Sequence, residues 1–299
     1  STLVSSLDFC FKGFPFTLYA LRSTLYNTPM SRRITNVTVS NLKAPLIYPF
    51  RIASGRHDAL ENVLLRIDCD NGLSGYGEAA VATHITGETV EQTKSNLQKF
   101  ASQLTGKDIA GYASLSEIAS KKFTKNKAAL AAVEMALLDA CTRSRGLPLW
   151  NYFGKTLSRV VTDITIVISD LAQTKKAARV FYGQGFRSFK IKIGQDLDLD
   201  INRVAAVCEA APRSKIILDA NQALSAQEAL FFLKDLEKLQ IRPVLIEQPV
   251  PKADWDGLAR ITRESKVKVC ADESVASLED ASKAIRTKAV DAINIKFMK

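Results

Sequence analysis

The stretch FRSFKIKIGQDLDLDINRVAAVCEAAPRSKIILDAN, residues 186–221, contains the repeating unit from which the fold is built. It begins and ends with short apolar runs rich in isoleucine, and a helix-length segment of mixed polar and apolar residues lies between them. This order predicts two parallel strands joined by a crossover helix.

The same alternation continues on both sides of this stretch, up to the last residues of the chain. The predicted strands lie in TDITIVI (162–168), FRSFKIKIG (186–194), KIILDAN (215–221), RPVLIEQP (242–249), VKVCADES (267–274) and VDAINIKF (290–297). No GxGxxG turn opens any of the intervening helices, and the nearest approach, SGYGEA at 74–79, follows a hairpin. The pattern therefore favours an α/β fold with a (β/α) TIM-like barrel in 156–299 over a Rossmann sheet.

Residues 34–155 predict a separate α+β domain. Strand patterns occupy ITNVTVSNL (34–42), ENVLLRIDCD (61–70) and LSGYGEA (73–79), and the Asn71-Gly72 turn between the last two predicts a hairpin. Helical periodicity follows in TVEQTKSNLQKFASQL (89–104) and in KAALAAVEMALLDACTRSRG (127–146). The second helix is expected to end at Gly146, which has the position of a C-cap.

Residues 1–33 are interpreted as a leader or extension. This segment has a single acidic residue, Asp8, and many Ser, Thr and Arg residues, which is typical of organelle transit peptides. The five cysteines are scattered without a CxxC motif, which favours reduced thiols and an intracellular protein. We therefore expect the cytoplasm or, if the leader is a transit peptide, a plastid or mitochondrion.

The overall composition excludes several classes of protein. With 46% hydrophobic and 24% charged residues the chain is globular, and no apolar run approaches the ~20 residues of a membrane span. The only two histidines, His57 and His84, argue against His-ligated metals. The net charge of +10 is spread over helix-like segments, so we expect neither a nucleic-acid nor a membrane partner.

Charged residues recur at the predicted carboxyl ends of the barrel strands, about one strand-plus-helix unit apart. They are Lys190 and Lys192, then Asp219 followed by Asn221, then Glu247, Asp272 and Lys296. Barrel active sites form at these strand ends. Three converging acids repel one another unless a cation lies between them, and an all-oxygen set suits Mg²⁺.

Lys192 and Lys296 belong to the second and sixth predicted strands. These strands lie about half the circumference apart in a barrel of eight. The two amines should therefore face each other, as a 1,1-proton transfer at one carbon requires.

The motifs KIK, LDAN, IEQP, ADES and NIKFMK resemble the enolase superfamily, in its muconate-lactonizing subgroup. The resemblance is strongest to the dipeptide epimerases of the L-Ala-D/L-Glu type, and it extends to PFRIASGR, GYGEA and AALAAVEMALLD with GLPLW in the predicted capping domain. That superfamily is itself the known example of a lysine base combined with Mg²⁺ that stabilises an enolate.

The resemblance implies an isomerase whose substrate is a dipeptide and whose cofactor is Mg²⁺. Asp219, Glu247 and Asp272 would bind the metal, Lys192 and Lys296 would exchange the α-proton, and Lys190 would lower the pKa of Lys192. For the substrate, the resemblance points to a closing loop at Phe50–His57 with Arg51 and Arg56, although each arginine could equally be a solvated loop residue. Asn221 is a further candidate for substrate binding, and self-association is common in the family.

The resemblance leaves alternatives open. A cycloisomerase or an o-succinylbenzoate synthase would use the same lysines and acids. The family's Asp-x-Asp motif on strand eight has no counterpart before Lys299, so the sequence is expected to be a family member cut short before its last two barrel strands. A truncated, non-catalytic metal-binding remnant is therefore a further hypothesis.

Overall fold

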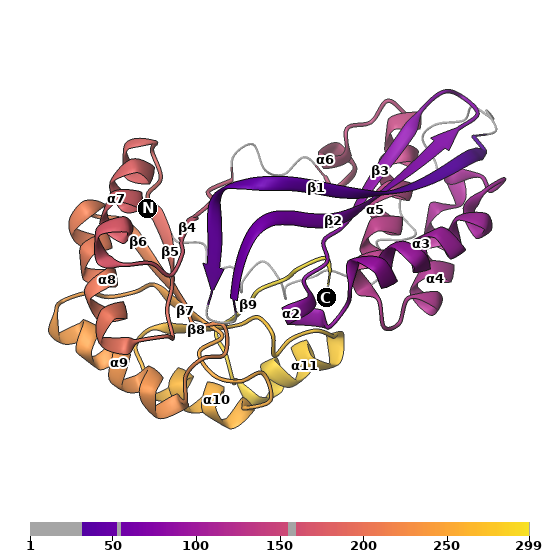
Figure 1. Cartoon of the computed structure of the whole chain (residues 1–299). Coiled ribbons are helices and arrows are strands. Elements are labelled where there is room, and N and C mark those ends of the chain that lie inside the picture. The colour runs from indigo at the N-terminus through magenta and orange to yellow at the C-terminus, as the bar shows by residue number, and fades with distance from the viewer. Residues whose placement is uncertain (1–31, 53–54, 155–159, 299) are drawn as a thin grey trace. The chain divides into compact units, whose positions relative to one another are not determined.

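The computed structural model describes residues 32–52, 55–154 and 160–298 (Figure 1). These residues form two compact units. The first contains Val160–Ile295 together with Ile47–Asp58, and the second contains the described residues of 32–46, 59–154 and 296–298. The predicted leader falls almost entirely outside the described residues. Within the described part, no helix is both long and apolar enough to cross a membrane.

The first unit contains the six predicted strands in one parallel sheet. They follow the order of the chain: β4 (Ile164–Ile166), β5 (Ser188–Lys192), β6 (Lys215–Asp219), β7 (Leu245–Glu247), β8 (Lys268–Ala271) and β9 (Ala292–Ile293). The connecting helices are α7 (Leu171–Gly183), α8 (Leu197–Ala210), α9 (Ala226–Lys238), α10 (Trp255–Glu264) and α11 (Leu278–Thr287). Figure 1 shows these helices along the outer side of the sheet. The predicted strand–helix alternation is confirmed.

Each helix of this unit begins after an Asp or Ser whose side chain accepts a hydrogen bond from a backbone N–H. These N-caps are Asp170, Asp196, Ser225, Asp254 and Ser277. Such residues compensate the unpaired N–H groups of a first turn, which defines where the chain turns from loop to helix.

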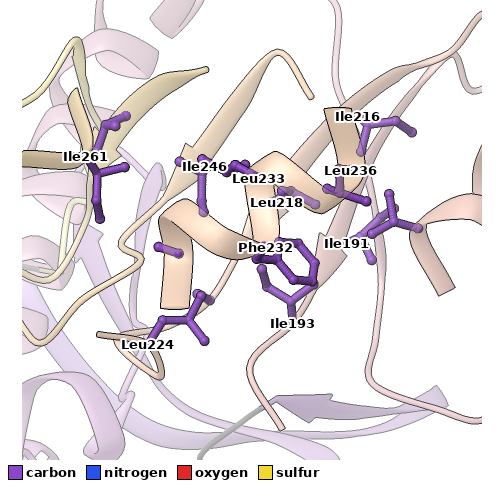
Figure 2. Close-up of a cluster of buried hydrophobic side chains, with 14 of the residues drawn as sticks. Ile191, Ile193, Ile216, Leu218, Leu224, Phe232, Leu233, Leu236, Ile246 and Ile261 are labelled. Carbon is purple, nitrogen blue, oxygen red and sulfur yellow. The ribbon is translucent and has the colours of Figure 1, made fainter. Parts of the chain in front are cut away.

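The core of the first unit lies between strands and helices. Figure 2 shows buried strand residues such as Leu218 and Ile246 together with Phe232 and Leu236 of α9. All four are at most 2% exposed. The side of the sheet that faces the helices is thus filled by apolar side chains. Polar side chains can be placed at the carboxyl ends of the strands, where barrel active sites form.

The second unit contains most of the three-stranded sheet β1 (Ile34–Ile52), β2 (Gly55–Cys69) and β3 (Ser74–Ala79), while residues 47–52 of β1 and 55–58 of β2 belong to the first unit. The antiparallel register from Val63↔Ala79 to Asp68↔Ser74 confirms the predicted hairpin. Its helices are α2 (Thr83–Thr86), α3 (Val90–Leu104), the 3₁₀ turn η1 (Ile109–Gly111), α4 (Tyr112–Lys122), α5 (Lys127–Ser144) and α6 (Leu149–Tyr152). Helices α3 and α5 agree with the sequence prediction, and Gly146 (φ 61°) follows the end of α5 as expected.

One predicted loop is largely strand in the structure. We expected a loop at Phe50–His57, but β1 continues to Ile52 and β2 begins at Gly55. Residues 50–52 and 55–57 are therefore strand, where the resemblance had implied a loop.

Strand β3 packs against the backbone of α5 through glycines. A Cβ built on Gly77 would lie 1.9 Å from the carbonyl oxygen of Ala132, and one on Gly75 would lie 2.3 Å from that of Ala136. The obstacle at both positions is helix backbone, which a rotamer change cannot relieve.

We therefore expect Gly77→Ala to lower the free energy of unfolding by at least the ~1–3 kcal/mol typical of overpacking. Gly111→Ala is the matched control, because a Cβ at Gly111 has no neighbour within 4 Å. Urea denaturation of both variants measures the difference. Equal unfolding free energies would contradict the close packing of β3 on α5.

Candidate active site

Parallel pairing places three of the predicted site residues in one row at the carboxyl end of the sheet. Lys192 is paired with Asp219 across β5 and β6, and Asp219 is paired with Glu247 across β6 and β7. Side chains at paired positions point to the same side of a sheet. The register therefore brings a lysine and two carboxylates side by side.

Two lysines share one oxygen of Asp219. The Nζ atoms of Lys192 and Lys190 lie 2.7 and 3.0 Å from Asp219 Oδ2. Lys190 Nζ also donates to Glu247 Oε2 at 2.7 Å, while Lys192 Nζ donates to the amide oxygen of Asn221 at 2.6 Å. Lys190 thus contacts the carboxylates of Asp219 and Glu247, and Lys192 contacts the carboxylate of Asp219 and the amide of Asn221.

The charges of this cluster change how readily its members ionise. Burial raises the pKa of Glu247, and the negative charge of Asp219 raises it further. Burial disfavours the Lys190 ammonium, but Asp219 and Glu247 outweigh burial and raise the pKa of Lys190 above its ordinary value. Lys190 is therefore a persistent cation among the acids.

Glu273 is a site residue that sequence reasoning missed. Its Oε1 accepts from Asn221 Nδ2 at 3.2 Å, and its buried Oε2 has no hydrogen-bond partner among the described residues. Burial and then the charge of Asp272 raise the pKa of Glu273. Its position directly after Asp272 in the ADES motif was the only available signal.

Asp272 lies one residue beyond β8 and is 1% exposed. Its backbone N–H donates to Oε1 of the fully buried Gln248 at 2.9 Å. Gln248 adopts a φ of 34° and also receives the N–H of Ser274 at 3.1 Å. Gln248, also missed from the sequence, thereby joins the ends of β7 and β8.

Asn294 extends the row to the strand β9. Its Nδ2 donates to Glu247 Oε1 at 2.8 Å, and its backbone N–H donates to the carbonyl of Ala271 at 2.8 Å. The sequence signal was its position two residues before Lys296, the same spacing that relates Lys190 to Lys192.

The roles expected of the remaining candidates stay predictions. Lys296 is half-buried, lies three residues beyond β9 and belongs to the second unit, so its opposition to Lys192 stays a prediction. Arg51 and Arg56 lie in β1 and β2, but their side chains fall outside the described residues. The contact of Asn221 with a substrate also stays a prediction.

The donor set fits a hard divalent cation in chemistry and in charge. The carboxylates of Asp219, Glu247, Asp272 and Glu273 outnumber the ammonium groups of Lys190 and Lys192, and one carboxylate oxygen is buried without a partner. In the part of the chain that the structure describes, no three Asp, Glu, Cys or His side chains enclose a metal position; the Lys190 ammonium bridges Asp219 and Glu247. Oxygen ligands with excess negative charge are those that Mg²⁺ prefers.

Two family models match the chain. The mandelate racemase / muconate lactonizing enzyme N-terminal domain matches residues 34–154, and the enolase C-terminal domain-like model matches residues 173–299. Together they cover the described residues except 32–33 and 160–172.

The similar proteins are epimerases. A hydrophobic dipeptide epimerase of Citrifermentans bemidjiense is 51% identical over 278 residues, which cover 90% of this chain and 76% of the relative. An L-Ala-D/L-Glu epimerase of Bacillus subtilis is 34% identical and covers 89% of this chain and 74% of the relative. The crystal structure of a dipeptide epimerase from Enterococcus faecalis, complexed with Mg and the dipeptide L-Leu-L-Tyr, matches with a TM-score of 0.85 at 34% identity, over 89% of this chain and 75% of that one.

Proposed function

This isomerase belongs to the mandelate racemase / muconate lactonizing enzyme family, and we propose that it inverts the α-carbon of the C-terminal residue of a dipeptide by a Mg²⁺-dependent, two-base proton transfer. The observation that carries the proposal is the row of Lys192, Asp219 and Glu247 at neighbouring strand ends, with Lys192 Nζ 2.7 Å from Asp219. The 51% identity to a hydrophobic dipeptide epimerase supports the substrate class.

In the proposed reaction one lysine acts as base and the other as acid. The neutral amine of Lys192 takes the α-proton from one face, and the Lys296 ammonium delivers a proton to the opposite face; the opposite epimer reacts with the roles exchanged. The electron pair of the broken C–H bond moves toward the substrate carboxylate and returns when the new C–H bond forms. Each turnover exchanges the protonation states of the two lysines, which solvent then restores.

The residues around Lys192 provide charge and orientation for this proton transfer. When held by Asp219, Glu247 and Asp272, Mg²⁺ supplies positive charge that stabilises the negative charge developing on the substrate carboxylate. Lys190, kept cationic by Asp219 and Glu247, adds a fixed positive charge beside Lys192. Asn221 accepts a hydrogen bond from Lys192 and so limits the directions in which its side chain can point.

The test is deuterium uptake at the α-carbons of a dipeptide library in D₂O with Mg²⁺, detected by mass. Apolar dipeptides come first because of the relative at 51% identity, and Ala-Glu dipeptides form the second group. We expect uptake at the C-terminal residue together with appearance of the second epimer. Folded protein that gives neither with any dipeptide would contradict the proposed function.

A further inference from the structure

Arg203 is the largest fully buried side chain of the described residues and plays no part in the proposed proton transfer. It lies in α8 with 0% exposure and pairs with Asp200, whose Oδ1 accepts from Arg203 Nη1 at 2.6 Å. Because burying two charges costs free energy that their attraction often fails to recover, such a pair contributes little net stability over apolar residues of the same volume. Net stability therefore does not account for the burial of this pair.

Two further hydrogen bonds of the pair reach the end of β5. Arg203 Nη1 donates to the carbonyl oxygen of Lys192 at 2.8 Å, and Asp200 Oδ2 accepts from the N–H of Gly194 at 2.7 Å. The backbone on both sides of Ile193 is thus held by two oppositely charged groups of one helix.

The same guanidinium ties this point to the neighbouring strand and helix. Arg203 Nη2 donates to the carbonyl of Val167, just beyond β4, at 2.7 Å, and Nε donates to Thr174 Oγ1 in α7 at 3.2 Å. The chain beyond β5 has little room to move, since Gly194 has a φ of 110° and a Cβ there would lie 2.5 Å from that of Ala223.

We propose that Arg203 and Asp200 form a positioning pair that holds the backbone of Lys192, so that its amine points at the α-carbon of the substrate. The proposal rests on the proposed function for the identity of the reaction, but the positioning itself is a property of this chain. The pair acts at the main chain, whereas Asp219 and Asn221 hold the Lys192 side chain at its far end. Both ends of the lysine are then fixed, as accurate proton transfer requires.

The first readout requires no catalysis. Brief acetylation with acetic anhydride, followed by peptide mass spectrometry, measures how accessible Lys192 is, with the exposed Lys266 as internal reference. Arg203→Lys keeps the positive charge but loses the planar guanidinium with its several N–H donors. In this variant we expect acetylation of Lys192 to rise severalfold. Asp200→Asn, which keeps the volume, is expected to act in the same direction and serves if Arg203→Lys does not fold.

Ile261→Ala is the matched control for general destabilisation. Ile261 is fully buried in the same core, and Figure 2 shows it at the left of the cluster, apart from Ile193. We expect this variant to lower the melting temperature without changing the acetylation of Lys192. Unchanged labelling in folded Arg203→Lys or Asp200→Asn, or an equal rise in Ile261→Ala, would overturn the positioning role.

The second readout separates the two bases. With each epimer of an active dipeptide in D₂O, Arg203→Lys should slow α-proton exchange of the epimer that Lys192 deprotonates by about 10- to 100-fold, the range expected for a base displaced by about 1 Å. Exchange of the other epimer should fall much less, and KM should change little. An equal loss of exchange for both epimers would refute a specific effect on Lys192. Absence of exchange in the wild-type protein would instead refute the proposed function. In that case the acetylation experiment alone decides whether Arg203 and Asp200 position Lys192.

Discussion

Lys192→Ala is expected to lower the rate of dipeptide epimerisation by about 10²–10⁴-fold, the usual contribution of a positioned acid or base. The loss should affect both directions, because each needs one lysine as base and the other as acid. Lys192 is 6% exposed and donates to Asp219 and Asn221, whereas the neighbouring amine of Lys190 is held by both Asp219 and Glu247. The measurement is initial epimerisation rates with the best dipeptide of the library, starting from each epimer.

The matched control is Lys268→Ala. Lys268 is also a lysine of a barrel strand, but it is exposed and lies at the first residue of β8, far along its strand from the row of acids. Its removal should leave epimerisation unchanged. If Lys192→Ala, with an unchanged melting temperature, retains more than a tenth of the wild-type rate, Lys192 is not the base.

Asp219→Asn is expected to abolish the thermal stabilisation that Mg²⁺ gives to the wild-type protein. A ligand that binds only the folded state raises the melting temperature, because it stabilises that state by RT ln(1 + [L]/Kd). The affinity for Mg²⁺ should fall by at least ~100-fold, which is the loss seen when residues that only hydrogen-bond to metal ligands are changed. Asn keeps the volume of Asp but removes the charge opposite Lys190 and Lys192, so the variant tests charge and not size.

Thermal unfolding with and without Mg²⁺, together with calorimetric titration of Mg²⁺, gives the affinity without relying on activity. Asp235→Asn is the control, because Asp235 is an exposed carboxylate of α9 that pairs only locally with Lys238. It should retain the full Mg²⁺ response. A normal response in Asp219→Asn would remove Asp219 from the set of metal ligands.

Much of the fold could be predicted because periodicity and turn residues are local signals. Each strand of the parallel sheet is an apolar run, and the Asn71-Gly72 turn marks the hairpin without reference to the rest of the chain. The short helix α2 and the helix α4 were missed, since polar residues interrupt their apolar periodicity. The extent of β1 and β2 was also missed, because strand length depends on a partner that local sequence does not reveal.

Some residues of the candidate site could be predicted from local sequence, and others could be found only in the structure. Charged residues at the ends of apolar strands, such as Asp219 and Glu247, stand out in the sequence because burial of a charge needs a reason. Gln248 and Asn294 are neutral, and their roles consist of bonds to other strands. Arg203 reads as an ordinary helix residue with an acid three positions earlier, and its burial appears only when α8 is packed against β5.

The row formed by Lys192, Asp219 and Glu247 also determines which insertions and deletions the chain can tolerate. Successive side chains of a strand point to opposite faces, so one residue added inside β6 would send Asp219 toward the helices and bring an apolar neighbour to the row. The same residue added between a helix and the following strand would lengthen a surface connection and leave the pairing intact. Length variation in this half of the chain should therefore concentrate in the connections, while the strands keep their residue count.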